Sequence, residues 1–171
     1  MKNNNLTLVS LFLTLSIFFS VSGSIPGYAQ EENQTIVEPQ FLSLQHAQSG
    51  TISEINATFY KLELNQVSDE TIEFSERPDR IIKTISTEEF ITECWSLEIP
   101  NNYQINPPNA DLIIHDNKLN TQMDFIIEIF NPVYDKDENT LMYDFKLLSN
   151  ATTLADLPKE IGKTNLFIDP K

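Results

Sequence analysis

The stretch QMDFIIEIFNPVYDKDENTLMYDFKLL, residues 122–148, decides the fold class that this chain is expected to adopt. Two apolar runs, 122–134 and 140–148, flank the polar segment DKDEN. Pro132 cannot donate to a sheet ladder, so it predicts an edge or a bulge near the end of the first run. The second run alternates with the period of a half-buried strand, which places on one face Leu141, Tyr143, Phe145 and Leu147. An antiparallel hairpin is therefore expected here.

Similar short runs occur on both sides of this hairpin. Tyr60, Leu62 and Leu64 alternate with polar residues and are expected to face a core, as are Ile72 and Phe74. The expected strands outside the hairpin cover residues 41–46, 51–55, 59–67, 71–75, 80–85, 111–115 and 164–168. A break is expected at Gln48 to Gly50, and the last strand is expected at an edge of the sheet.

One helix is expected, over residues 86–95 (STEEFITECW), with Ser86 or Thr87 as its N-cap and Glu89 completing a capping box. A long surface loop is expected at 96–109, and one helical turn within 154–162. Seven to nine short strands with one short helix, and no alternation of strands with helices, predict an all-β fold. The expected architecture is an antiparallel β-sandwich, or a partly closed barrel.

Residues 1–29 have the layout of a secretory signal peptide. Lys2 precedes the apolar run 6–21, and Gly27 and Ala29 are small residues suited to a cut after Ala29. The alternative is that the apolar run is retained as a membrane anchor. In either case the protein is expected to be secreted, extracellular or displayed at the cell surface.

The charge balance narrows the expected partners. The 171 residues hold 11 Lys and Arg against 25 Asp and Glu, for a formal charge of -14. Nucleic-acid binding needs clustered basic residues, so no nucleic acid is expected as a partner, and a membrane is expected only if residues 1–29 stay attached. Residues 30–40 are polar and acidic and predict a flexible lead-in, followed by a single β-rich domain over 41–171.

No catalytic residue is predicted. Cys94, the single cysteine, shares a face of the expected helix with Phe90 and Trp95, where a thiol acts as a small apolar side chain. His46 and His115 lie in separate strands without a third ligand nearby in the sequence. We expect a binding or structural module for an unknown extracellular or cell-surface ligand, with no cofactor. A small extracellular enzyme or a divalent-metal-binding protein is the alternative.

Both arginines of the chain fall in one heptapeptide, FSERPDR, residues 74–80. Pro78 stiffens the turn between Arg77 and Arg80. Each guanidinium offers a fixed fork of donors that matches a carboxylate or a phosphate. Two interpretations stay open: internal ion pairs that pin the turn, or a site for an anionic ligand.

The segment DKDEN has a partial likeness to a calcium loop. Asp135, Asp137 and Asn139 place oxygen-bearing side chains at alternate positions. No glycine occupies the sixth position, and Lys146 stands where the bidentate Glu of an EF-hand would be. A solvated hairpin tip explains these residues, and a loose calcium site is the alternative.

Three N-x-T sequons follow the expected cleavage point, at Asn33, Asn56 and Asn150. Each lies in an expected turn or flexible segment, where a glycan would be accessible. The protein is therefore a candidate glycoprotein if its host modifies such sequons.

Residues 49–169 resemble an uncharacterised family of signal-peptide-bearing proteins of archaea and bacteria. The shared motifs are F-S-[DE]-R-P-x-R, matched by residues 74–80, and T-x-x-F near a Trp, matched by Thr87, Phe90 and Trp95. Three more are P-P-N-A at residues 107–110, N-P-x-Y-D at 131–135 and T-L-x-Y-D at 140–144. Glu76 stands where Asp is more frequent. The resemblance implies no activity, but it directs attention to the arginine turn and to residues 131–135. It suggests that Arg77 or Arg80 pairs with Asp135 or Asp144.

Overall fold

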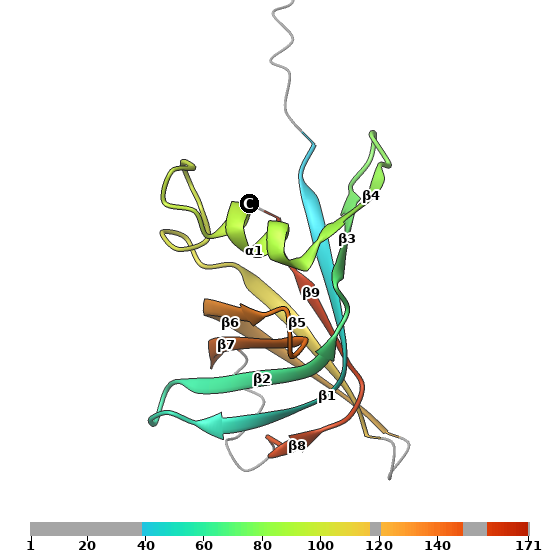
Figure 1. Cartoon of the computed structure of the whole chain (residues 1–171). Helices are drawn as coiled ribbons and strands as arrows, with labels where there is room; N and C mark the ends of the chain where they lie inside the picture. The colour runs from blue at the N-terminus through green and yellow to red at the C-terminus, as the bar shows by residue number, and fades with distance from the viewer. Residues whose placement is uncertain (1–38, 117–120, 149–156, 171) are drawn as a thin grey trace, which may run out of the picture. The chain divides into compact units, whose positions relative to one another are not determined.

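Strand β1 (Phe41–Glu54) organises the sheet because both halves of it pair with strands on both sides. Its first half lies between β3 (Glu70–Ser75) and β9 (Thr164–Ile168). Its second half lies between β2 (Tyr60–Val67) and β8 (Glu160–Ile161). Figure 1 shows β1 bending between the two halves. One long strand therefore pairs with four other strands of the sheet.

The computed structural model describes residues 39–116, 121–148 and 157–170. These residues form nine strands, all paired antiparallel, and one helix (Figure 1). The remaining elements are β4 (Ile82–Ser86), α1 (Thr87–Cys94), β5 (Asn109–Asp116), β6 (Thr121–Asp135) and β7 (Thr140–Leu147). The prediction of an antiparallel all-β fold with seven to nine strands and one short helix is confirmed.

The strand pairings close into a ring. They run from the second half of β1 through β2, β7, β6, β5 and β9, and return to the first half of β1. The hairpin of β3 and β4 continues from β1 outside this ring (Figure 1). The prediction that the last strand, β9, is an edge strand is wrong. It lies between β1 and β5 because its alternate side chains, Leu166 and Ile168, complete the core.

The break predicted at Gln48 to Gly50 does not occur, because these residues lie inside β1. Gly50 pairs with Leu64 of β2 on one side and Ile161 of β8 on the other. A Cβ at this position would contact the backbone carbonyl oxygen of Glu63 and the side chain of Ile161. The glycine therefore marks a close approach of three strands, not a turn.

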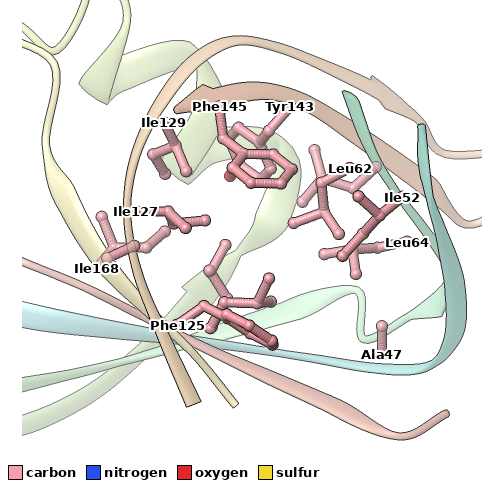
Figure 2. Packing of buried hydrophobic residues seen from close by; sticks show 14 of the residues in the cluster. Ala47, Ile52, Leu62, Leu64, Phe125, Ile127, Ile129, Tyr143, Phe145 and Ile168 are labelled. Atoms are coloured by element: carbon pink, nitrogen blue, oxygen red, sulfur yellow. The ribbon is translucent and has the colours of Figure 1, made fainter. Parts of the chain in front are cut away.

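The core lies between the two sides of the ring, as in a sandwich, and Figure 2 shows its packing. The core is filled by alternate side chains of β1, β2, β5, β6, β7 and β9, and the predicted inward face of β2 is confirmed. The largest fully buried side chains are Tyr143, Phe90, Phe145, Leu62, Leu64, Leu112, Ile114, Ile127, Ile129, Leu141, Leu166 and Ile168. Each large apolar side chain in this set contributes about 1.5–3 kcal/mol through removal from water.

Helix α1 packs against the core with the predicted cap and face. The Ser86 hydroxyl accepts a hydrogen bond from the Glu89 N–H at 3.1 Å, which confirms Ser86 as the N-cap. Phe90 and Cys94 are buried, and the Trp95 ring packs edge-on against Phe90 with centroids 6.0 Å apart. The capped helix thus supplies apolar side chains to the core although it has only eight residues.

The two faces of β3 are the reverse of the prediction. Ile72 and Phe74 lie half-buried on the outer face, whereas Thr71 and Glu73 are buried inside. The register with β1 decides this, because Phe74 pairs with Leu42, which is also on the outer side. Here β1 and β3 turn polar residues inward and apolar residues outward, so the hydrophobic pattern alone gives the wrong face.

Two further predictions concern irregular segments. The ladder between β6 and β7 shifts register between Phe130 and Val133, which confirms a bulge at Pro132. The helical turn predicted within 154–162 falls partly outside the described residues, and its described remainder contains β8 instead of a helix.

Replacing Gly50 with alanine tests the close approach of the three strands. We expect the free energy of unfolding to fall by about 1–3 kcal/mol, because the new Cβ has to displace the Glu63 carbonyl. Urea denaturation followed by circular dichroism measures the change. Ser53→Ala, at an exposed position of the same strand, is the control and should shift stability by less than about 0.5 kcal/mol. A Gly50→Ala protein as stable as the wild type would contradict this packing.

Candidate functional site

A chain of hydrogen bonds crosses the interior beneath α1. The Tyr143 hydroxyl donates to Gln45 Oε1 at 2.9 Å, and the Gln45 amide donates to Thr71 Oγ1 at 3.4 Å. Thr71 Oγ1 lies 3.1 Å from Thr87 Oγ1, and Thr87 donates to the Ser68 carbonyl at 2.9 Å. Burial raises the pKa of the Tyr143 hydroxyl. The chain ties the start of α1 to β3, β1 and β7 and gives each buried polar side chain in it a partner.

The α1 pocket is a cavity of about 360 Å³ next to this chain, between α1 and the first half of β1. Glu73, Lys83, Cys94 and Tyr103 contribute polar groups to its wall. Lys83 Nζ lies 2.8 Å from Glu73 Oε2, and the Tyr103 hydroxyl donates to the Asp169 carbonyl at 2.7 Å. Burial is the largest cause that raises the pKa of Tyr103, and the nearby Glu73 carboxylate adds to it. Internal contacts therefore engage the polar groups of Glu73, Lys83 and Tyr103 in this pocket.

Sequence reasoning missed the ion pair of the α1 pocket, although a signal for it was present. Glu73 and Lys83 pair directly across β3 and β4. The two residues are equally distant from Pro78, so a hairpin centred on that proline places them opposite each other. The prediction that Cys94 is a buried apolar side chain is confirmed.

The Arg turn, residues 75–80, is held by three hydrogen bonds at its base. The Ser75 N–H donates to the Ile81 carbonyl at 2.9 Å, and the Ile81 N–H donates to Ser75 Oγ at 2.7 Å. The Arg80 N–H donates to the Glu76 carbonyl at 3.1 Å, and Arg80 has a left-handed φ of 53°. These contacts fix the backbone of the turn while both arginine side chains remain exposed.

A second cavity, of about 520 Å³, opens beside the Arg turn. Its wall combines both arginines with apolar side chains, of which Ile81 is 42% exposed and Ile82 is 70% exposed. Its lining residues are Phe74, Ser75, Glu76, Arg77, Arg80, Ile81 and Ile82. The cavity therefore offers guanidinium donors and apolar contact area on one surface.

The ion pairs suggested between the Arg turn and Asp135 or Asp144 do not form. Asp144 instead contacts Lys61, with 3.4 Å between Nζ and Oδ1, and Asp135 accepts hydrogen bonds from its own hairpin turn. Within residues 39–116, 121–148 and 157–170, neither arginine has an ion-pair partner. The lysines that do form ion pairs are Lys61, Lys83, Lys136 and Lys146.

Two motifs that carry the family resemblance meet at the bulge of β6. Asn131 has a left-handed φ of 48°, and its amide donates to Asp144 Oδ2 at 3.0 Å. Lys61 holds the other oxygen of the same carboxylate. The bulge is thus fixed by contacts to the neighbouring strand β7, and Asn131 and Asp144 have a structural role.

The DKDEN segment forms the tight turn between β6 and β7. Asp135 Oδ1 accepts hydrogen bonds from the N–H groups of Asp137 and Glu138, both at 3.1 Å, and Asn139 has a φ of 49°. In the part of the chain that the structure describes, no three His, Cys, Asp or Glu residues are grouped for a metal ion. The turn explains these residues, and the calcium site stays a prediction.

The two histidines do not join the Arg turn. His46 Nδ1 lies 2.9 Å from Asn165 Oδ1, and its Nε2 lies 3.1 Å from Gln48 Nε2. His115 lies near the end of β5, where it pairs with Gln122 at the start of β6. The Arg turn follows β3 at the opposite end of the neighbouring strands β5, β9 and β1. Arg77 lines the cavity of about 520 Å³, whereas neither His115 nor Asp135 lines that cavity or those of about 360 and 330 Å³.

Of the three sequons, only Asn56 falls within the described residues. It lies exposed between β1 and β2, and its Oδ1 accepts hydrogen bonds from the N–H groups of Thr58 and Phe59 at 3.0 and 3.1 Å. Asn33, Asn150 and the expected signal peptide lie outside them. Among the described helical residues, none form a helix long and apolar enough to cross a membrane.

The outer apolar row runs across four strands from the cavity beside the Arg turn. It consists of Ile82, Phe74, Ile72, Leu42, Leu44 and Phe167, from β4, β3, β1 and β9. Cross-strand pairing joins Phe74 to both Ile82 and Leu42, and joins Leu44 to both Ile72 and Phe167. Three strand spacings make this row about 14 Å wide. Contiguous apolar side chains outside the core are typical of a surface that meets a partner.

Fold and sites together define an all-β antiparallel module with an arginine-bearing hairpin outside its closed ring. Comparison of the chain with protein-family models, with curated proteins and with solved structures found no match. The family resemblance proposed from the motifs therefore stays a prediction, and the function is inferred from the geometry.

Substitutions at Asn131 test the role of the bulge. Asn131→Ala removes the hydrogen bond to Asp144 and puts alanine at a left-handed φ, so the free energy of unfolding should fall by about 1–3 kcal/mol. Asn131→Gly loses the same hydrogen bond but accepts the φ, and should lose less. Urea denaturation of both variants separates the two contributions. If Asn131→Ala were as stable as the wild type, the bulge would not depend on this residue.

Proposed function

We propose that this protein is an exported, non-catalytic module that binds an anionic partner through the Arg turn. One observation carries the proposal: Arg77 and Arg80, the only arginines of a chain with 25 acidic residues, have exposed side chains and no ion pair within the described residues. A guanidinium fork that is not used internally is available to a carboxylate, a phosphate or a sulfate.

The hydrogen bonds at the base of the Arg turn support this proposal. They order the backbone from Ser75 to Ile81 without using either guanidinium. A turn that is already ordered loses less conformational entropy when a ligand binds. The arginines are therefore presented for binding and are not needed to build the hairpin.

The cavity beside the Arg turn indicates the chemistry of the ligand. Glu76 and Asp79 accompany Arg77 and Arg80, so the turn carries no net charge. Recognition would then depend on the geometry of the guanidinium forks more than on long-range attraction. Exposed Ile81 and its neighbours favour a ligand that places apolar groups next to its anion.

Isothermal titration with three anionic probes tests the proposed function: tripolyphosphate, a heparin hexasaccharide and hexaglutamate. At least one should bind the purified protein. The double variant Arg77→Ala/Arg80→Ala should bind it at least tenfold more weakly, because a hydrogen bond to a charged group contributes about 1.5–3 kcal/mol. Arg77→Lys/Arg80→Lys keeps the charge without the fork and should also be weakened.

The matched control is Lys159→Ala/Lys163→Ala, which removes two exposed positive charges outside the hairpin. This control should bind like the wild type. Equal losses in the arginine and lysine double variants would point to general charge attraction and contradict a site at the Arg turn. If none of the three probes bound the wild type, the proposal would be wrong.

Export is tested by expression with the native N-terminal segment. We expect the protein in the culture medium, with an intact mass that begins at Gln30, because small residues precede that position. Recovery of the full-length chain in the membrane fraction would favour the anchor instead.

A further inference from the structure

Strand β4 is a free edge of the described sheet, because it pairs with β3 alone while β3 lies between β4 and β1. The hairpin of β3 and β4 projects beyond the ring in Figure 1. An unpaired edge presents a row of N–H and C=O groups that another strand can use.

The pairing pattern identifies which groups of β4 point outward. The Ser75 N–H donates to the Ile81 carbonyl, so these two residues form a hydrogen-bonded pair. In an antiparallel ladder such pairs alternate with pairs that exchange no hydrogen bonds. The backbone groups of Lys83 therefore point to β3, and those of Ile82 and Thr84 point to the open edge.

The edge of β4 contains no proline, and its pairing with β3 shows no register shift, so two of the features by which natural sheets block strand addition do not occur in this strand. The charge of its one lysine, Lys83, is engaged on the inner side of the hairpin, where the ammonium contacts Glu73 and lies 4.4 Å from the centroid of the Phe41 ring. Ile82 is 70% exposed beside the edge.

From these features we infer that β4 accepts an extended polypeptide segment as an added strand, with an acidic residue of that segment bound at the Arg turn. The inference rests on the proposed function, since it names the class of anionic partner. It corresponds to β-strand addition, in which main-chain hydrogen bonds supply affinity and side-chain contacts supply specificity.

The two faces of the hairpin define the partner sequence. Partner side chains beside Ile82 lie on the outer side and extend the outer apolar row, so alternate partner residues are apolar. Ile82 lines the same cavity as Arg77 and Arg80. A carboxylate one or two residues beyond the position opposite Ile82 therefore reaches the guanidiniums.

The probes for the experiment are two fluorescein-labelled heptapeptides of alternating valine and threonine. One carries glutamate at its N-terminus and the other at its C-terminus, because an added strand can run in either direction along β4. Fluorescence anisotropy measures their binding to the purified protein. At least one should bind, and Arg77→Ala/Arg80→Ala should weaken it at least tenfold. N-methylation of alternate peptide nitrogens on the bonding side should abolish binding.

The matched pair of variants is Thr84→Pro and Thr84→Val. Proline removes the outward N–H of Thr84, which β3 does not use, so the hairpin should be retained and binding lost at least tenfold. Valine keeps the N–H and should bind like the wild type. Circular dichroism checks that Thr84→Pro folds, and if it does not, the N-methylated peptides decide the question.

The outcomes separate this inference from the proposed function. If the arginine variant loses binding but Thr84→Pro and N-methylation have no effect, strand addition is wrong and the anion site stands. If the probes of the previous section bind through the arginines but neither heptapeptide binds, strand addition is also wrong. If Arg77→Ala/Arg80→Ala leaves the binding of the anionic probes and of the heptapeptides unchanged, both the proposed function and strand addition are wrong. Wild-type dimers that Thr84→Pro dissociates in sedimentation would assign the edge to a second copy and contradict an acidic partner strand.

Discussion

The structure depends on the pairing of β1 with a strand on each side along both of its halves. This pairing requires a residue without a side chain where β2 and β8 approach together, and Gly50 meets that requirement. Because β1 bends, its two halves reach opposite ends of the ladder and close the ring, which removes free edges there and encloses the core. The hairpin of β3 and β4 remains outside the ring, and the Arg turn lies at its tip.

A second constraint is the reversal of polarity in the first half of β1 and in β3. Among their inward residues are the polar side chains of Gln45 and Thr71, which the hydrogen bonds from Tyr143 to Thr87 satisfy, and Glu73, which pairs with Lys83. Their outward residues Leu42, Leu44, Ile72 and Phe74 belong to the outer apolar row. The same register therefore gives a buried polar network that holds α1 and an apolar surface that leads to the free edge. Departures from simple patterning of this kind are expected at functional surfaces.

The parts of the fold that sequence reasoning predicted correctly are those fixed by neighbouring residues. The hairpin of β6 and β7, its bulge at Pro132 and the N-cap at Ser86 each depend on contacts within a short stretch. The face of β3 was predicted incorrectly because Ile72 and Phe74 indicate an alternation but not the side that is buried, and their pairing with β1 decides that. The break predicted at Gly50 is wrong for the same reason, since its partners Leu64 and Ile161 lie on strands that are distant in the sequence.

For the candidate site, too, local features could be predicted from the sequence and long-range contacts could not. From the sequence alone it follows that both arginines share one turn, that the chain is strongly acidic, and that short alternating strands make the fold all-β, because composition, spacing and period are local properties. Only the tertiary structure decides that Asp135 and Asp144 are engaged elsewhere, that the Arg turn opens on an apolar cavity, and that β4 is a free edge. The physical reason is that strand pairing over long sequence separations determines which side chains are satisfied internally and which remain available to a partner.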